Sequence, residues 1–519
     1  MANKHLFKSP IAQHVPAADT VNLAGGKAYA MSPAHALAQL AVTGSFRATY
    51  YASAEAQLAD VLELARTVDP QLVAKTAVYA RKRGLMKDMP ALLCALVSKH
   101  PQLLARVFPR VIDDAKMLRV FVQMIRSGVT GRRSLGYRPK KLVQAWLDAR
   151  TDEQVFFASV GKDPSLADVL KLAHPEPKTP SRRALYAYLL GAPHDVSVLP
   201  AVVRHYEDFK AGRTLEVPDV PFQMLTSLPL SVGDWVSIAE RATWTQTRMN
   251  LNTFVRQGVL STPGMVEKIA TKLRDPDAIR RARVFPYQLM TSYHATAGLV
   301  PAAISEALQD AMEIALLNVP VLEGKVHVLV DVSGSMGSPI TGQQLGATTI
   351  MRCVDVAALF GAAILRTNPL TSVMAFEQSV VKGLTLNPRD TVITNAQRLA
   401  AVGGGGTNCA APLAALNEQR ATGDLVIFVS DNESWIDTRR GPGTGVMHEW
   451  DRFRARSPRA KLVCIDLTPN RSTQAPDRAD ILNVGGFSDA VFETVAAFHQ
   501  GRGGAEHWLS EIRAIDLAA

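Results

Sequence analysis

The stretch HVLVDVSGSMGSP, His327 to Pro339, places one acid and two hydroxyls, Asp331, Ser333 and Ser335, directly after a run of β-forming residues. If the run KVHVLV is a strand, Asp331 lies at its carboxyl edge and both serines lie in the following loop. Carboxylate and hydroxyl oxygens that converge in this way are the hard ligands that Mg²⁺ or Ca²⁺ prefers. The stretch therefore predicts part of a divalent-cation site.

Two further loops offer ligands of the same kind, which matters because a divalent ion needs about six of them. The segment AVGGGGTNCA presents Thr407 after four glycines, which let the backbone approach closely. The segment VIFVSDNESW presents Asp431 at the end of another apolar run. The predicted metal ligands are Asp331, Ser333, Ser335, Thr407 and Asp431, with Mg²⁺ as the expected cation and Mn²⁺ or Ca²⁺ as alternatives.

Other kinds of chemistry fit these residues less well. Ser335 would be the nucleophile of a serine hydrolase, but SGSMG only loosely matches the G-x-S-x-G elbow and no histidine is obviously paired with it. The loop GGGGTN lacks the Lys-Ser/Thr ending of a phosphate-binding P-loop. Asp331 taken alone would be explained as the cap of the helix that follows. The sequence therefore favours a metal site over a hydrolase or an NTPase at these residues.

The elements that must position these ligands alternate between strand and helix from about Val321 to the carboxyl terminus. Short apolar runs predict strands at KVHVLVDV, TSVMAF, DLVIFVSD, KLVCIDL and DILNV. Helical spacing predicts helices within residues 341–365 and near TNAQRLAAV and AAPLAALNEQR. This order indicates a parallel, doubly wound α/β domain over residues 321–519, in which ligands bind at the carboxyl ends of strands.

The first 320 residues have a different pattern. From Ser32 to about Asn318, apolar residues recur at helical spacing, and short turns with Pro or Gly separate the segments. Pro70, Pro90 and Pro101 lie where the first turn of a helix tolerates a missing N–H. Helix pairs at a loose period of ~40 residues resemble HEAT-like units, and the length favours an extended or closed array over a compact bundle. We therefore predict an all-α domain over residues 1–320.

Positive charge is concentrated in the predicted helical domain. The chain of 519 residues carries a net charge of +10, of which residues 1–320 contribute +12 and the remainder −2. Residues 101–150 alone hold 11 basic and 3 acidic side chains, several of them in GRRSLGYRPKK, Gly131 to Lys141. Clustered positive charge suits a polyanion, with nucleic acid as the first candidate, although a solvated helix end and loop have the same composition.

Composition also predicts where the protein works. No run approaches the ~18 uncharged apolar residues of a membrane span, and the amino terminus lacks the apolar core of a signal peptide. The four cysteines are scattered and mostly lie within apolar runs, which is typical of reduced core thiols. These features predict a cytoplasmic protein that does not bind membranes.

Two family resemblances follow from these motifs. DVSGS, Thr407 in a glycine-rich loop and Asp431 after an apolar strand together resemble the metal-ion-dependent adhesion site of von Willebrand factor A domains. A helical array ahead of such a domain, with SDNESWID at Ser430 to Asp437, resembles the TROVE-domain family, that of the sixty-kilodalton Ro autoantigen and its bacterial relatives. The segments GSFRATYYASAEAQL and LADVLKLAHPEP are similar to family segments, so the resemblance covers most of the chain.

The resemblance implies a ribonucleoprotein component that binds noncoding RNA and is not an enzyme. In this family the helical repeats close into a ring. Single-stranded 3′ ends of misfolded noncoding RNAs enter its hole, and small structured Y RNAs bind its basic outer surface. The resemblance also implies a role in RNA quality control, an exoribonuclease as a further partner, no role for DNA and a monomeric chain. The competing hypothesis is a protein-interaction scaffold whose A domain docks an acidic partner through the cation, without an RNA role.

Residues of the helical domain are assigned to RNA by their match to family segments or by their chemistry. Single-stranded ends need stacking or hydrogen-bonding groups, for which Tyr137, His174 and Tyr186 are available. His174 matches a family histidine associated with RNA binding, and a helix-end histidine bonded to a carbonyl is the alternative. The segment ATWTQTRMNLNTFVRQG resembles the family helix whose Arg and Asn residues are expected to face the hole. The predicted RNA-binding residues are Arg132, Arg133, Arg138, Lys140, Lys141, His174, Arg182, Arg183, Arg248, Asn252 and Arg256.

Overall fold

Two compact units make up the computed structural model, which describes residues 15–282, 284, 286–315, 319–342, 351–436, 441–488, 490–502, 504 and 506–518. One of them, here called the A-domain unit, comprises residues 1–67, 285–287 and 316–514. The other, the helical unit, comprises residues 68–284, 288–315 and 515–519. The predicted fold class is confirmed, because a helical-repeat region precedes a parallel α/β sheet. Within the described residues, no helix is long and apolar enough to cross a membrane.

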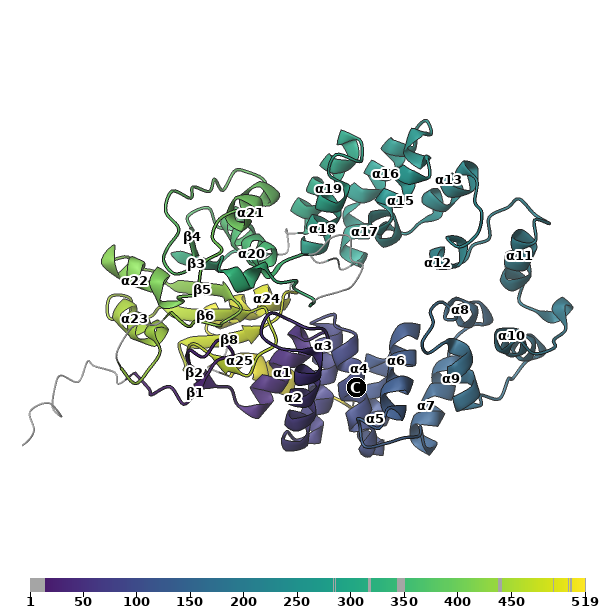
Figure 1. Ribbon diagram of the computed structural model, residues 1–519, viewed down its shortest axis with the longest axis horizontal. Helices are drawn as coiled ribbons and strands as arrows, with labels where there is room; N and C mark the ends of the chain where they lie inside the picture. Colours follow the sequence, from purple (N-terminus) through teal and green to yellow (C-terminus); the bar gives the residue numbers. More distant parts are fainter. Residues whose placement is uncertain are drawn as a thin grey trace, which may run out of the picture. The chain divides into compact units, whose positions relative to one another are not determined.

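A five-stranded sheet in the order β4-β3-β5-β6-β8 forms the centre of the A-domain unit, and its neighbouring strands are all parallel (Figure 1). Each strand corresponds to one of the predicted apolar runs. β3 and β5 are buried along their whole length, as expected for parallel strands that helices cover on both faces. The strands are β3 (Val326–Asp331), β4 (Ser372–Phe376), β5 (Leu425–Ser430), β6 (Lys461–Asp466) and β8 (Ile481–Gly485).

Helices cover the two faces of this sheet. On one face, α22 and α23 contribute Leu413 and Trp450 to a core that includes Leu329 and Phe428 of the sheet. Because side chains alternate along a strand, Val330 points to the opposite face, where α20 and α21 pack against each other and α20 contacts β3. The helices predicted near TNAQRLAAV and AAPLAALNEQR are confirmed as α21 and α22.

The helix predicted within residues 341–365 is shorter in the structure, where α20 begins at Cys353. Arg352 has extended backbone and forms a β-bridge with Pro339, so it stands outside the helix. Residues 343–350 lie outside the described part of the chain. The helices of this region are α20 (Cys353–Thr367), α21 (Val392–Ala400), α22 (Ala410–Glu418), α23 (Gly445–Arg454), α24 (Ala490–His499) and α25 (His507–Arg513).

The amino-terminal segment packs on the A domain. A short strand pair, β1 (Thr20–Val21) and β2 (Lys27–Ala30), joins β7 (Ser472–Thr473) in a second, antiparallel sheet. α1 (Pro33–Thr43) contacts β8 and α25 of the A domain and also α2 (Ala54–Thr67).

This packing gives a different division from the boundary predicted after residue 320. Residues 1–67 are grouped with the A domain, not with the helices that follow them. The buried side chain of Gln39 in α1 donates a hydrogen bond to the carbonyl of Thr468, 2.9 Å away. Partners more than four hundred residues apart leave no local pattern, so the sequence alone indicated only where the pattern of strands and helices changes.

The helical unit consists of short helices that pack on near neighbours in the sequence. α3 contacts α4 and α5, α4 contacts α6, α5 contacts α7, and α7 contacts α9, as stacked helix pairs do. Pro70 and Pro101 are the first residues of α3 and α5, and Pro90 lies in the first turn of α4, as predicted. The helices are α3 (Pro70–Lys82), α4 (Asp88–Leu96), α5 (Pro101–Val111), α6 (Ala115–Arg126), α7 (Tyr137–Asp148), α8 (Asp152–Phe157), α9 (Leu166–Ala173), α10 (Pro180–Leu190), α11 (Ala201–Lys210), α12 (Phe222–Leu225), α13 (Val232–Arg241), α14 (Trp244–Met249), α15 (Leu251–Arg256), α16 (Met265–Arg274), α17 (Pro276–Ala282), α18 (Pro286–Thr296) and α19 (Ala302–Ala315).

Candidate functional site

The predicted metal ligands come from three loops at the carboxyl edge of the sheet. Asp331 is the last residue of β3, and Asp431 directly follows the neighbouring strand β5. The parallel register pairs Val330 with Val429, so the two strands end side by side. Asp331, Ser333, Ser335, Thr407 and Asp431 are all buried, and none is more than 6% exposed.

Hydrogen bonds connect the two acids to the hydroxyls around them. Asp331 accepts from the backbone N–H of Ser333 through Oδ1, 2.9 Å, and from the hydroxyl of Ser430 through Oδ2, 2.6 Å. The Oγ atoms of Ser333 and Ser335 are 3.3 Å apart, and Asp431 accepts from the backbone N–H of Glu433 through Oδ1, 3.2 Å. The structure thus gathers carboxylate and hydroxyl oxygens from two strand ends into one cluster.

The glycine-rich loop is fixed against this cluster by its backbone. The N–H of Gly404 donates to the carbonyl of Val332, 2.9 Å, and Gly405 accepts from the N–H of Gly334, 2.8 Å. Gly403 has φ +92°, and a Cβ added there would lie 2.3 Å from the carbonyl oxygen of Val332, so only glycine allows the approach. The run of glycines therefore serves to bring the loop that carries Thr407 against the motif loop.

Buried negative charge characterises the cluster. Burial, followed by the nearby carboxylate of Asp431, raises the pKa of Asp331 to about 7. Burial also raises the pKa of Asp431, and it raises the pKa of Glu433 to about 8 with a further contribution from Asp431. Two like charges held together away from water are unfavourable, and a cation between them would relieve the repulsion.

The donor set fits a hard divalent cation. Carboxylate and hydroxyl oxygens, without sulfur or imidazole, suit Mg²⁺ or Mn²⁺ better than Zn²⁺. Within the described residues, no group of three or more His, Cys, Asp or Glu side chains is arranged to hold a metal, so any cation here depends on the serine and threonine hydroxyls. The Oε1 atom of Glu433 is buried and has no hydrogen-bond partner in the described part of the chain. Glu433 and Ser430 are neighbours of the site that the sequence reasoning missed, although both lie in the quoted stretch VIFVSDNESW.

The basic segment of the helical unit presents cations around the start of α7. Arg133, Arg138 and Lys141 are exposed, and Lys140 is half-buried. Tyr137, the first residue of α7, is 74% exposed, and the Nζ of Lys141 lies 6.0 Å from the centre of its ring. An exposed aromatic ring among cations offers both stacking and charge to a nucleic acid.

Arg132 has a partner inside the protein. Its guanidinium donates a hydrogen bond to the carbonyl of Ser98, 2.8 Å away, and the side chain is half-buried. Arg132 therefore anchors the loop before α7, while its neighbour Arg133 is the exposed cation.

Arg182 and Tyr186 are not placed as the prediction for RNA contact requires. Arg182 pairs with Asp152 and donates to the carbonyls of Leu147, 3.1 Å, and Arg150, 2.5 Å, at the carboxyl end of α7. A cation that binds the last carbonyls of a helix stabilises that helix end. Tyr186 is buried, so its ring offers no stacking surface. The adjacent Arg183 is exposed.

Arg248 and Asn252 likewise point into the protein. Arg248 is buried and donates to the carbonyl of Gln288, 2.7 Å, and to the hydroxyl of Ser292, 2.8 Å. Asn252 donates to the carbonyl of Ala295, 3.1 Å. These two side chains join α14 and α15 to α18, and their assignment to RNA stays a prediction.

Arg256 and His174 are exposed and fit the prediction in position. Arg256 is the last residue of α15. His174 ends α9 in the left-handed conformation, φ 47°, and its Nδ1 lies 3.2 Å from the carbonyl of Leu172. His174 is thus the helix-end histidine of the alternative interpretation, and its exposed ring remains available to a ligand.

Comparisons with known proteins agree with this architecture. A family model described as the Ro60 vWA domain matches residues 325–499. The RNA-binding protein RO60 of Deinococcus radiodurans is 26% identical, and the alignment covers 92% of this chain and 95% of that protein. The chain is similar to a Ro protein along most of its length. The RNA-binding protein RO60 of Caenorhabditis elegans is 23% identical over 46% of this chain and 37% of its own length. The crystal structure of the Deinococcus radiodurans RO (RSR) protein has a TM-score of 0.62 and 22% identity, and it covers 91% of this chain and 100% of its own.

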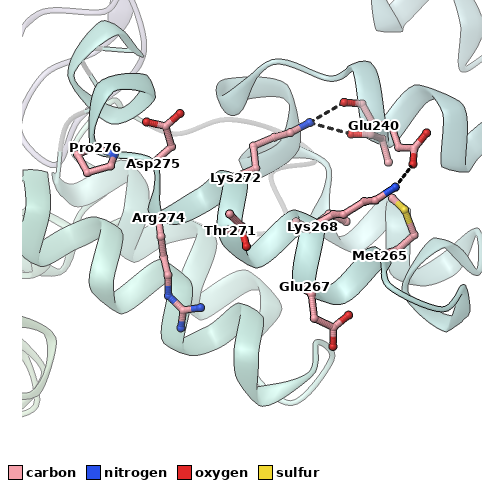
Figure 2. Close-up of a pocket in the computed structure, with 11 residues that line it drawn as sticks. Glu240, Met265, Glu267, Lys268, Thr271, Lys272, Arg274, Asp275 and Pro276 are labelled. Atoms are coloured by element: carbon pink, nitrogen blue, oxygen red, sulfur yellow. Dashed lines mark hydrogen bonds and ion pairs between the residues drawn. The ribbon is translucent and has the colours of Figure 1, made fainter.

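A pocket of about 1020 Å³ on the helical unit holds further cations, and Lys268 and Lys272 have partners within the protein (Figure 2). Lys268 pairs with Glu240, 2.5 Å. Lys272 donates to the carbonyls of Ala239, 3.1 Å, Glu240, 2.8 Å, and Ala242, 2.9 Å, at the end of α13. Burial lowers the pKa of Lys272. Lys272 therefore holds α16 against α13, whereas Lys268 is exposed and forms a surface ion pair with Glu240.

The contrast between Arg182 and Arg183 gives a testable prediction. Arg182→Ala is expected to lower the free energy of unfolding by about 2–3 kcal/mol, because it leaves a half-buried carboxylate and two helix-end carbonyls without their donor. Arg183→Ala, the matched control, should change it by less than about 0.5 kcal/mol. Urea denaturation of both variants measures the difference. Equal stability of the two would contradict the inward role of Arg182.

Proposed function

We propose that this chain binds RNA through its helical unit. The observation that carries the proposal is the similarity to the Deinococcus radiodurans RNA-binding protein RO60 along nearly the full length of both chains. The exposed basic segment supports it, because Arg133, Arg138 and Lys141 are exposed, whereas Arg182 binds carbonyls at the end of α7. The names of both relatives describe RNA-binding proteins, in keeping with a function that is not enzymatic.

The proposed ligands are noncoding RNAs of two kinds. Small structured Y-type RNAs would bind a basic outer surface, where lysine and arginine side chains contact phosphates and do not recognise the bases. Single-stranded 3′ ends of misfolded RNAs would enter a central hole of the helical ring, where rings and amides contact bases. RNA quality control in the cytoplasm, with an exoribonuclease as partner, is the cellular role that fits such ligands.

Salt-dependent binding of defined RNAs tests the proposal. Each phosphate neutralised by a lysine or arginine contributes about −0.7 to −0.9 to the slope of log affinity against log salt concentration. We expect a structured RNA with a single-stranded 3′ tail to bind with a slope of several units and well above polyglutamate of matched charge. A second RNA without the tail separates the surface mode from the end-binding mode. Affinity no better than that of polyglutamate would contradict the RNA function and leave the protein-interaction scaffold as the function.

We also propose that Asp331, Ser333, Ser335, Thr407 and Asp431 hold a divalent cation, with Mg²⁺ first and Mn²⁺ or Ca²⁺ as alternatives. The support is the oxygen-only donor set and the raised pKa of the two buried acids, which a cation would offset. When bound, the ion supplies a Lewis-acidic centre that can hold a carboxylate or order the loops around it.

A further inference from the structure

The turn of the amino-terminal hairpin lies against the loop that follows β5. The turn, here called the hairpin turn, comprises residues 22–26 between β1 and β2. The loop, here called the Asp431 loop, comprises residues 431–436, and both segments belong to the A-domain unit. The side chain of Asn22 donates a hydrogen bond through Nδ2 to the carbonyl of Ser434, 2.8 Å away. Partners that are 412 residues apart in the chain are thus in direct contact.

Further contacts show that the hairpin turn fits closely on the Asp431 loop. The N–H of Ala24 donates to Oε2 of Glu433, 3.0 Å. A Cβ added at Gly26 would overlap with the carbonyl oxygen of Ser434, so the approach of the two backbones needs a glycine there. The turn is itself fixed, because Oδ1 of Asn22 accepts from the N–H of Gly26, 2.7 Å. Asn22, Glu433 and Ser434 are buried, so bulk water does not replace a donor that is removed here.

The Asp431 loop holds two of the proposed metal ligands on its other side. The N–H of Glu433 donates to Oδ1 of Asp431, 3.2 Å, and so orients this carboxylate. The N–H groups of Trp435 and Ile436 both donate to the carbonyl of Thr407, 3.1 Å each. The backbone of the loop therefore connects the hairpin turn to both ligands.

We propose that Asn22 is a positioning residue of the metal site, which holds the Asp431 loop through Ser434 and does not contact the cation. This inference rests on the proposed metal site. Groups that hold metal ligands from outside raise the affinity for the metal, because the ligands are already in place when it binds. The two ends of the Asn22 amide suit this role, since Oδ1 binds within the hairpin turn and Nδ2 binds the loop.

The arrangement couples the occupancy of the metal site to the docking of the hairpin turn. If the contact of Asn22 with Ser434 strengthens cation binding by some factor, the bound cation must strengthen the contact by the same factor. The N–H of Ala24 is bonded to Glu433, so amide exchange in the turn reports this contact. A bound cation is therefore expected to hold the hairpin turn more firmly on the Asp431 loop.

Mn²⁺ binding and amide hydrogen exchange of the full chain test the inference. Asn22→Ala removes the donor to Ser434, and Leu23→Ala, the matched control, shortens a neighbouring side chain that is 53% exposed. We expect Asn22→Ala to bind Mn²⁺ about 3- to 10-fold more weakly than wild type, the loss typical of one hydrogen bond, and Leu23→Ala to bind within about twofold. Saturating Mn²⁺ should slow amide exchange of residues 22–26 in wild type and in Leu23→Ala, and by less in Asn22→Ala.

Gly26→Ala is a second, independent variant. It leaves Asn22 in place, and its methyl group pushes the hairpin turn away from the Ser434 carbonyl. It should therefore weaken Mn²⁺ binding in the same direction as Asn22→Ala. Near-ultraviolet circular dichroism equal to that of wild type shows that a variant has kept its fold.

The possible results separate the two proposals. If wild type binds no Mn²⁺, the metal site and this inference are both wrong. If Asn22→Ala and Gly26→Ala bind Mn²⁺ as tightly as wild type, or if Leu23→Ala loses as much affinity as they do, Asn22 does not position the ligands and the metal site stands. Amide exchange of residues 22–26 that does not respond to Mn²⁺ in wild type would also overturn the inference.

Discussion

RNA affinity is expected to fall at least about 100-fold at 0.1 M salt when Arg133, Arg138 and Lys141 are all changed to glutamate, because three attractive phosphate contacts become repulsive. The three side chains are exposed and lie around the start of α7. The slope of log affinity against log salt concentration should also become shallower by about 2–3 units, close to one unit for each phosphate that is no longer neutralised. Fluorescence anisotropy with a labelled RNA at several salt concentrations measures both quantities.

A matched variant on the other unit controls for net charge. Lys382, Arg389 and Arg420 are exposed on the A-domain unit, and their change to glutamate alters the charge of the chain by the same amount. This control should retain affinity within about threefold, since it leaves Arg133, Arg138 and Lys141 unchanged. Similar losses in both variants would mean that binding follows overall charge and has no dedicated surface. A loss for Y-type RNA alone would assign the basic segment to that class.

The second large effect is expected for Asp331→Asn, which should stabilise the protein without a cation and abolish its stabilisation by a cation. In EDTA, Asp331→Asn removes one of two buried like charges, so the free energy of unfolding should rise by about 1–3 kcal/mol. With Mg²⁺ at 100 times its Kd, wild type should gain about 2.7 kcal/mol and the variant little or nothing. Urea denaturation of wild type and variant in EDTA and in Mg²⁺ measures both differences in the free energy of unfolding.

Asp424→Asn is the control for this experiment. Asp424 lies at the opposite end of β5, where its carboxylate accepts from the N–H of Lys325, 2.9 Å. Its replacement should leave the response to Mg²⁺ equal to that of wild type. An undiminished Mg²⁺ response in Asp331→Asn would remove the metal assignment, and so would unchanged Mn²⁺ binding when Asp331 and Asp431 are both replaced by alanine.

The pKa of Asp331 determines whether the stability of the protein in EDTA rises or falls with pH. Its value of about 7 in the folded protein lies above the usual 3.8, so the folded state binds this proton more tightly than the unfolded chain. The ionised carboxylate therefore lowers the stability of wild type progressively as pH rises from about 4 to about 7. The advantage of Asp331→Asn should be largest above pH 7 and shrink towards pH 4. An advantage that grows as pH falls would contradict the raised pKa.

The strand ends of the A domain were predictable because their geometry follows from local pattern. Continuous apolar runs identify parallel strands, and parallel strands in one sheet end at a common edge. Asp331 and Asp431 each follow such a run, so their proximity needed no knowledge of side-chain packing. The glycines before Thr407 indicated a close backbone approach in the same way, and Gly403 makes that approach.

The directions of the basic side chains were not predictable in the same way. Arg182 and Arg183 are adjacent and identical in type, yet one binds the end of α7 and the other is exposed. Arg248 is similarly occupied by α18, whose partner carbonyl lies 40 residues further along the chain. Which face of a helix is covered depends on which other helix packs against it, and only the tertiary structure shows which helix that is.

The sequence by itself therefore determined the two fold classes and the order of the elements, and it placed two buried acids at neighbouring strand ends, because these features depend on periodicity and on residues close to strand ends. Only the tertiary structure decided that residues 1–67 pack with the A domain and that Arg182 and Arg248 bind inside the helical unit. Each of these facts joins segments far apart in the chain. The contacts that stabilise these arrangements form between surfaces that exist only after the helices and strands have packed.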